Sequence, residues 1–177
     1  MALSKTDYLI YRECKKNAWM KIHKADVYNS QPLSDFEKMI IKTGGEVELS
    51  ARKLFPSGVL IEGRDAAAQA LTKEYLKRKQ DVLFQAIFEK DGFLAATDVL
   101  EYDSESDSYF LYEIKSTNEI DEKKHLHDLA FQANVLRLCG LKIRKYFLIH
   151  LNKEYVRVGD LNVTSLFQIE DVTERIE

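Results

Sequence analysis

Residues 82–116 constrain the fold most strongly, because the spacing of apolar side chains changes there from a helical repeat to a repeat of two. The segments "VLFQAIFE", "FLAATDVLEY" and "SYFLYEIKS" have the composition and alternation of strands. Asp91-Gly92 and "DSESDS" lie between them and are typical of hairpin turns. We therefore expect a three-stranded antiparallel meander.

Helices are expected on both sides of this meander. Ser4 and Ser34 are typical helix N-caps, and Gly140 is a typical helix end. Five helices are predicted at residues 4–20, 34–42, 45–54, 65–80 and 122–138. "KYFLIHLN" and "YVRVG" are predicted as the last strands.

This order of elements predicts an α/β (α+β) fold. A mixed central sheet is flanked by helices and preceded by an N-terminal helical region. At 177 residues the chain fits one domain, residues 1–177, with a mainly helical part at 1–80 and the sheet and active-site core at 81–160.

Charge and cysteine content exclude some classes of protein. The net charge of −3 gives no global signature of nucleic-acid binding, although local basic groups remain compatible with it. Cys14 and Cys139 are the two cysteines, so a disulfide framework and a four-cysteine iron–sulfur cluster are excluded. The N-terminal segment lacks the apolar core of a signal peptide, and no apolar run is long enough to span a bilayer. We expect a cytoplasmic protein without a membrane segment.

Three charged residues of the meander form the candidate site. Glu113 and Lys115 share one face of their strand, because side chains alternate along a strand. Asp98 interrupts an apolar row on the preceding strand, so strand pairing would bring it near Glu113. Two adjacent carboxylates repel unless a cation neutralises them, and oxygen ligands suit Mg²⁺ or Mn²⁺. Lys115 would then position the attacking water and stabilise charge on a phosphate.

An ordinary structural role is the alternative for these residues. Glu-x-Lys on a strand is most often a solvated cross-strand ion pair. The Asp one strand earlier, the small residues "AAT" beside it and a Gln-bearing helix afterwards favour the active-site interpretation.

The arrangement of Asp98 in "TDVL" and Glu113–Lys115 in "EIK" resembles the PD-(D/E)XK nuclease superfamily. It is most similar to the RecB-like branch, which includes CRISPR-associated exonucleases. The resemblance implies a restriction-endonuclease-like core in which an Asp on one strand and Glu-x-Lys on the next hold a metal ion.

The same resemblance implies roles for three further residues. Gln132 in "DLAFQANVL" matches the helical Gln motif of the branch and would contact substrate phosphate or Lys115; a hydrogen bond to backbone is the alternative. Glu48 stands four residues after Gly44, where the branch carries a His ligand, and would bind metal; a solvated helix glutamate is the alternative. The Ile114 carbonyl would complete the metal shell.

Departures from the branch also have consequences. Leu136 stands where the Gln motif carries Tyr, and Glu48 replaces His. Relatives in the branch often hold an iron–sulfur cluster on four cysteines, and this chain has two. We predict no iron–sulfur cluster.

Three longer segments resemble one bacterial family of unknown function that carries this nuclease domain at its N-terminus. They are "LSKTDYLIYRECKKNAW", "ARKLFPSGVLI" and the segment from "DLAFQ" to "VTERI". This resemblance implies that the chain is a fragment of a longer protein with a C-terminal domain.

A basic cluster with interleaved aromatic residues lies in the first predicted helix. Arg12, Lys15, Lys16 and Tyr11 would contact DNA through phosphates and base stacking. A solvated cationic face with aromatic residues packed on the core is the alternative.

Together these features predict a Mg²⁺- or Mn²⁺-dependent, exonuclease-like enzyme that hydrolyses phosphodiester bonds of single- or double-stranded DNA. Asp98, Glu113, Lys115 and Gln132 would form its catalytic set, and Glu48, Asp98, Glu113 and Ile114 its metal ligands. The alternative is a catalytically inactive nuclease-fold module that binds nucleic acid or a protein.

Overall fold

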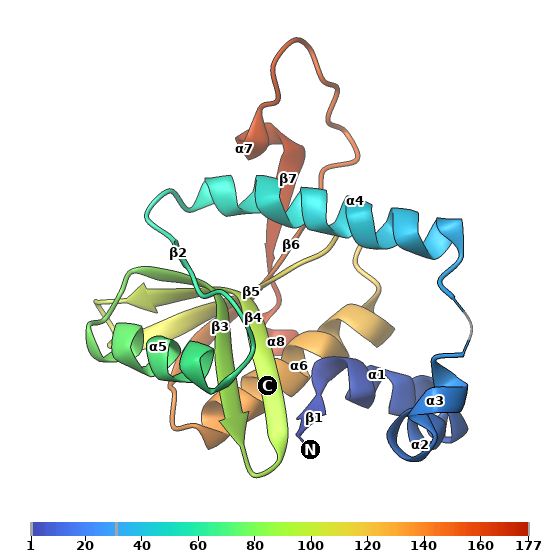
Figure 1. Ribbon diagram of the computed structural model, residues 1–177. Helices are drawn as coiled ribbons and strands as arrows, with labels where there is room; N and C mark the ends of the chain where they lie inside the picture. The colour runs from blue at the N-terminus through green and yellow to red at the C-terminus, as the bar shows by residue number, and fades with distance from the viewer. Residues whose placement is uncertain (1, 31, 177) are drawn as a thin grey trace.

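The computed structural model describes residues 2–30 and 32–176. Within this part of the chain, seven strands form one mixed sheet in the order β2-β3-β4-β5-β6-β7, and β1 pairs with the start of β4. The strands are β1 (Leu3–Ser4), β2 (Val59–Leu60), β3 (Val82–Lys90), β4 (Phe93–Asp103), β5 (Ser108–Ile114), β6 (Ile143–Leu151) and β7 (Phe167–Asp171). Helices flank this sheet (Figure 1), and the predicted fold class is confirmed.

The predicted meander is present as β3, β4 and β5, which pair antiparallel. Asp91 and Gly92 join β3 to β4, and both have positive φ, as the tight hairpin turn requires. β5 then pairs with β6 in parallel, and β6 pairs with β7 antiparallel. A parallel pair needs a long crossover, and a helical segment between β5 and β6 provides it.

The helices lie in the N-terminal region, between strands and after the last strand. Their bounds are α1 (Lys5–Glu13), α2 (Lys15–His23), α3 (Ala25–Tyr28), α4 (Asp35–Ala51), the 3₁₀ turn η1 (Arg52–Leu54), α5 (Ala66–Lys77), the π-helical turn η2 (Glu122–Leu126), α6 (His127–Leu138), α7 (Val163–Leu166) and α8 (Thr173–Ile176). Helix α5, with Asp65 as its N-cap, and the helical segment before β6 agree with the sequence.

The helix boundaries predicted in the N-terminal region are wrong at two points. The single helix expected at residues 4–20 is broken at Cys14, whose extended backbone separates α1 from α2. The two helices expected at 34–42 and 45–54 form the continuous helix α4. Gly44 and Gly45 lie inside α4, because a helical glycine costs only about 1 kcal/mol and no proline interrupts the segment.

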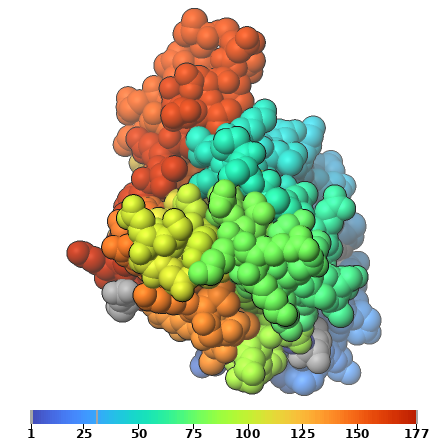
Figure 2. Space-filling model, turned by 90° about the vertical axis from the view of Figure 1, so that its left-hand side faces the viewer, coloured from blue at the N-terminus to red at the C-terminus, as the bar shows by residue number. Residues whose placement is uncertain are grey.

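The strand predicted at "YVRVG" is also wrong. Residues 155–159 contain no strand, and Val156 and Val158 are 78% and 87% exposed. The position beside β6 is occupied by β7, so residues 155–159 do not pair with β6. The segment between β6 and α7 instead projects from the body of the molecule (Figures 1 and 2).

Apolar residues pack on both faces of the sheet. One cluster contains Leu111, Leu129 and Tyr146, with Tyr8 of α1 packed against it. The other contains Val99, Tyr112 and Ala51, with side chains from α7 and η1 at its margin. Side chains of β5 therefore alternate between the two clusters, and Glu113 lies on the face covered by α6.

Helix α4 crosses the molecule above the sheet with much of its length exposed (Figure 1). Its exposed apolar side chains include Phe36, Met39, Ile40 and Ile41. Among the described residues, no helix combines the length and apolar character that crossing a membrane requires.

Candidate active site

Asp98 of β4 and Glu113 of β5 lie opposite each other on two neighbouring antiparallel strands. Val99 pairs with Tyr112, and Asp98 and Glu113 are the next residues along each strand. Asp98 Oδ2 accepts a hydrogen bond of 2.8 Å from the Ile114 backbone N–H, so the carboxylate binds the adjoining strand directly. The structure thus brings together the two carboxylates that the sequence singled out.

Glu113 is almost completely buried, at 1% exposure, and both its carboxylate oxygens are hydrogen-bonded. Oε1 accepts from Lys115 Nζ at 2.7 Å and from Lys5 Nζ at 2.8 Å. Oε2 accepts from Gln132 Nε2 at 2.5 Å. Three donors from three different elements therefore fix this carboxylate.

Asp128 of α6 is a further carboxylate of the site that the sequence reasoning did not assign. It is buried and forms ion pairs with Lys115 and, at 3.1 Å, with Lys5. Its Oδ1 also accepts from Gln132 Nε2 at 3.2 Å. Asp128 precedes Gln132 by four residues, so both lie on one helical face, and this spacing was a usable signal.

Gln132 has a different partner from the one expected. It is 0% exposed and donates to Glu113 and Asp128, so its amide contacts two carboxylates rather than Lys115 or a backbone carbonyl. Its burial also keeps it from a bound substrate. Its role in this geometry is to hold the two carboxylates in place.

Gln85 of β3 links Glu48 to Asp98. Its Nε2 donates to Glu48 Oε1 at 2.6 Å and to Asp98 Oδ1 at 3.3 Å. Gln85 has φ of 54° inside a strand, a backbone conformation that costs a non-glycine residue free energy. Arg52 also contacts Glu48 Oε1, at 2.5 Å, so Glu48 faces the site rather than open solvent.

A cavity of about 220 Å³ opens beside Asp98. Asp98 and Glu48 supply its negative charge, and Lys5, Arg52 and Arg64 its positive charge. The full lining is Ser4, Lys5, Thr6, Glu48, Arg52, Arg64, Gln85, Leu94, Ala96 and Asp98. Cations around a pair of carboxylates suit a ligand that carries phosphate together with a metal ion.

The surroundings of the site raise the pKa of two of its carboxyls and lower that of the third. Burial and the charge of Glu113 raise the pKa of Asp98 to about 7 and that of Asp128 to about 6. Burial opposes ionisation of Glu113, but Lys115 and Lys5 outweigh it and lower the pKa of that carboxyl below its usual range. Burial likewise opposes the charge of each lysine, yet the carboxylates raise the pKa of both Lys5 and Lys115.

The ligand atoms of the site are of the type that a hard divalent cation binds, but they are not arranged around a common point in this structure. Asp98, Glu113, Glu48 and the Ile114 carbonyl offer only oxygen atoms. Burial and the neighbouring charge of Glu113 raise the pKa of Asp98, and a cation bound beside it would offset both effects. Among the described residues, however, no three Asp, Glu, His or Cys side chains form a ready-made metal cage. Lys5 and Lys115 occupy Glu113 Oε1 instead.

The predicted DNA-contacting residues lie on α1 and α2, and all four are exposed: Arg12, Lys15, Lys16 and Tyr11. The Lys15 ammonium lies 5.7 Å from the centroid of the Tyr11 ring. Tyr8 of the same helix instead packs inward, stacked on Phe131. The aromatic residues of α1 therefore divide between the core and the surface.

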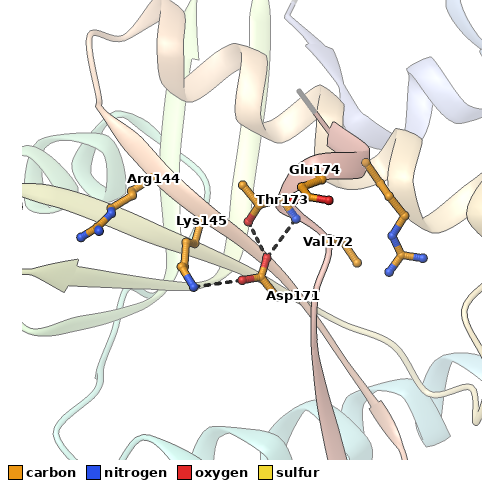
Figure 3. Close-up of a pocket in the computed structure, with 7 residues that line it drawn as sticks. Arg144, Lys145, Asp171, Val172, Thr173 and Glu174 are labelled. Carbon is orange, nitrogen blue, oxygen red and sulfur yellow. Dashed lines mark hydrogen bonds and ion pairs between the residues drawn. The ribbon is translucent and has the colours of Figure 1, made fainter.

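A larger hollow, of about 550 Å³, lies beside β6, β7 and α8 (Figure 3). Most of its charged groups form ion pairs, either within the lining or with neighbouring residues. Asp171 accepts from the backbone and hydroxyl of Thr173 and from Lys145 Nζ, as Figure 3 shows. Arg175 pairs with Glu122 and Glu170. These ion pairs make this hollow a weaker candidate site than the cavity at Asp98.

Comparison with known proteins found no matching protein-family model and no matching curated protein.

Proposed function

We propose that this protein is a Mg²⁺- or Mn²⁺-dependent nuclease that hydrolyses DNA phosphodiester bonds. The observation that carries the proposal is the juxtaposition of Asp98 and Glu113 on adjoining strands, with Lys115 Nζ 2.7 Å from Glu113. The cavity with Lys5, Arg52 and Arg64 on its wall supports a phosphate-bearing substrate.

Asp98, Glu113, Glu48 and the Ile114 carbonyl would hold the divalent ion. Such an ion polarises a phosphoryl oxygen and lowers the pKa of a water molecule that attacks it. Lys115 would orient that water and stabilise the charge that develops on the phosphate. Gln132 and Asp128 act on Lys115 and Glu113 as positioning residues, because their contacts fix both side chains.

The substrate would approach from the side of α1 and η1. Lys5, Arg52 and Arg64 lie around the cavity, and the exposed Arg12, Lys15 and Lys16 of α1 and α2 add charge for the flanking phosphates. Exposed Tyr11 offers a ring on which a base of single-stranded DNA would stack. An exonuclease-like mode of cleavage is part of this proposal.

Cleavage of labelled single- and double-stranded DNA in Mn²⁺ tests the proposal. Wild-type protein should cut DNA, and EDTA should abolish cutting. Lys115→Ala should lower the rate about 1,000-fold, because the group that orients water and stabilises phosphate charge is lost. Lys77→Ala on the outer helix α5 is the matched control, since it removes an exposed lysine away from the site.

Circular dichroism of both variants separates loss of activity from loss of folding. Wild-type protein that binds DNA but never cuts it would reject the enzyme and favour a nucleic-acid-binding module with this fold. Equal rates for Lys115→Ala and wild type would reject the role of Lys115.

A further inference from the structure

Lys5 is the first residue of α1, yet its ammonium lies inside the carboxylate cluster of the sheet. Lys5 Nζ is 2.8 Å from Glu113 Oε1 and 3.1 Å from Asp128 Oδ1. The contact with Glu113 joins residues 108 positions apart in the sequence. The first turn of α1 is therefore part of the candidate site.

The helix itself gives no reason for a lysine at this position. The N-terminus of a helix carries a partial positive charge, so a cation there is unfavourable. Ser4 and Asp7 already form the capping box that satisfies this end of α1. The favourable interactions of Lys5 come from the carboxylates it faces.

The backbone of Lys5 is held from two sides. Leu3 N–H donates to the Gly92 carbonyl at 2.7 Å, in the pairing of β1 with β4. Tyr8 stacks on Phe131 of α6, with ring centroids 5.2 Å apart. The flexible four-carbon side chain of Lys5 is therefore the part of this residue that can change conformation.

The balance of charge shows what Lys5 supplies. Lys5 and Lys115 each form ion pairs with both Glu113 and Asp128. Without Lys5, these two carboxylates would face the single ammonium of Lys115. A divalent cation bound at Glu113 would supply the positive charge that Lys5 supplies in this structure.

The cavity offers space into which the Lys5 side chain can move away from Glu113. This side chain is 25% exposed and lines the cavity that contains Asp98 and Glu48. Lys115 is 18% exposed, and neither it nor Glu113 is among the residues that line this cavity. Of the two ammonium groups on Glu113 Oε1, that of Lys5 is therefore the one positioned to move.

We propose that Lys5 is a built-in counter-ion of the carboxylate cluster, which occupies Glu113 Oε1 in the metal-free protein and is displaced into the cavity when a divalent cation binds. The inference rests on the proposed function for the metal site. It adds that Lys5 lowers the affinity for metal and places its ammonium on the substrate side of the site when metal is bound.

Calorimetric titration with Mn²⁺ alone tests this competition without any activity measurement. Lys5→Met removes the ammonium and keeps much of the apolar stem. It should bind Mn²⁺ about tenfold or more tightly than wild type, because a unit charge next to the ligand oxygen no longer has to be displaced. Lys5→Gln should show the same tightening, and it keeps the test decisive where Lys5→Met fails to fold.

Arg64→Met is the matched control. Arg64 lines the same cavity, is exposed, and has no hydrogen bond or ion pair recorded among the described residues. Its removal therefore reports the effect of lost charge alone, which should change Mn²⁺ affinity by about twofold or less. Equal tightening in the Arg64 and Lys5 variants would overturn the displacement, as would unchanged or weaker binding by the Lys5 variants.

The two proposals fail in different ways. Tighter Mn²⁺ binding by the Lys5 variants together with no DNA cleavage by any protein supports the counter-ion and rejects the nuclease. DNA cleavage by wild type without tighter binding in the Lys5 variants supports the nuclease and rejects the counter-ion. Absence of Mn²⁺ binding in every variant rejects the counter-ion and the metal site together.

Discussion

Asp98 and Glu113 are neighbours on adjoining strands, but their surroundings differ. Glu113 is buried under α6, and three side-chain donors occupy its two oxygens. Asp98 borders the cavity, and Gln85, at 3.3 Å, is its one recorded side-chain donor among the described residues. One carboxylate of the pair is already neutralised, and the other is not.

The difference in partners explains the opposite directions of the two pKa shifts. Lysines lower the pKa of Glu113 despite its burial, whereas burial and the charge of Glu113 raise that of Asp98. In this structure Glu113 acts as a fixed structural anion, and Asp98 is the carboxylate open to a new partner. Substitutions of each residue should therefore have opposite effects on the metal-free protein.

Glu113→Gln should have the largest effect on stability. The amide removes one of the two carboxylates that join Lys5 to Lys115, and removal of one partner from a buried ion pair costs about 3 kcal/mol. Urea denaturation in EDTA measures this loss. Glu46→Gln, which removes a solvent-exposed pair with Lys42, should change the free energy of unfolding by less than about 0.5 kcal/mol. A loss no greater than that of Glu46→Gln would contradict the structural role of Glu113.

Asp98→Asn should stabilise the metal-free protein, and the gain should depend on pH. The pKa of Asp98 is about 7 in the folded protein against an ordinary value of 3.8, so between these pH values the folded state keeps a proton that the unfolded state has lost. Stability from this group is present below pH 4 and is lost as pH rises towards 7.

The variant should therefore be about 1–2 kcal/mol more stable than wild type at pH 8. The amide oxygen of Asn accepts a weaker hydrogen bond from Ile114 N–H than the carboxylate does, and this loss offsets part of the gain. Urea midpoints in EDTA at pH 5, 6, 7 and 8 measure this trend. A gain that is constant across this range, or a loss at pH 8, would show that Asp98 does not carry the predicted shift.

Gln85→Gly should have the smallest effect on stability. Glycine adopts the positive φ without strain, which offsets the loss of the hydrogen bonds to Glu48 and Asp98, so the net change should stay within about 1 kcal/mol. Mn²⁺ affinity should nevertheless fall several-fold, because the two carboxylates are no longer linked.

Asp91→Gly is the control, because Asp91 has φ of 52° in an exposed hairpin turn. It should leave Mn²⁺ affinity unchanged, as measured by calorimetry. Equal Mn²⁺ affinity for Gln85→Gly and wild type would remove Gln85 from the site.

Local patterns predicted the meander, the crossover helix and the positions of Asp98, Glu113 and Lys115. These features depend on strand alternation and turn residues, which neighbouring residues determine. The wrong predictions lie where contacts between residues far apart in the sequence determine the structure. Nothing near Cys14 marks the break between α1 and α2, and the alternation of residues 155–159 does not reveal that β7 takes the sheet edge.

Two residues of the candidate site were beyond sequence reasoning for a similar reason. Lys5 meets Glu113 only because β1 and Tyr8 dock α1 onto the sheet and α6. Gln85 reaches Glu48 and Asp98 from a backbone conformation that propensity disfavours for glutamine. Asp128 differs, because its spacing from Gln132 was visible in the sequence.

The docking of α1 has a consequence for the order of folding. The meander forms from contacts close in sequence, whereas the Lys5–Glu113 contact closes a loop of 108 residues. Loop closure costs entropy that grows with loop length, so long-range contacts tend to form late. We expect the sheet to collapse first with its carboxylates unneutralised, and the charge cluster to be completed only when the N-terminal helix arrives.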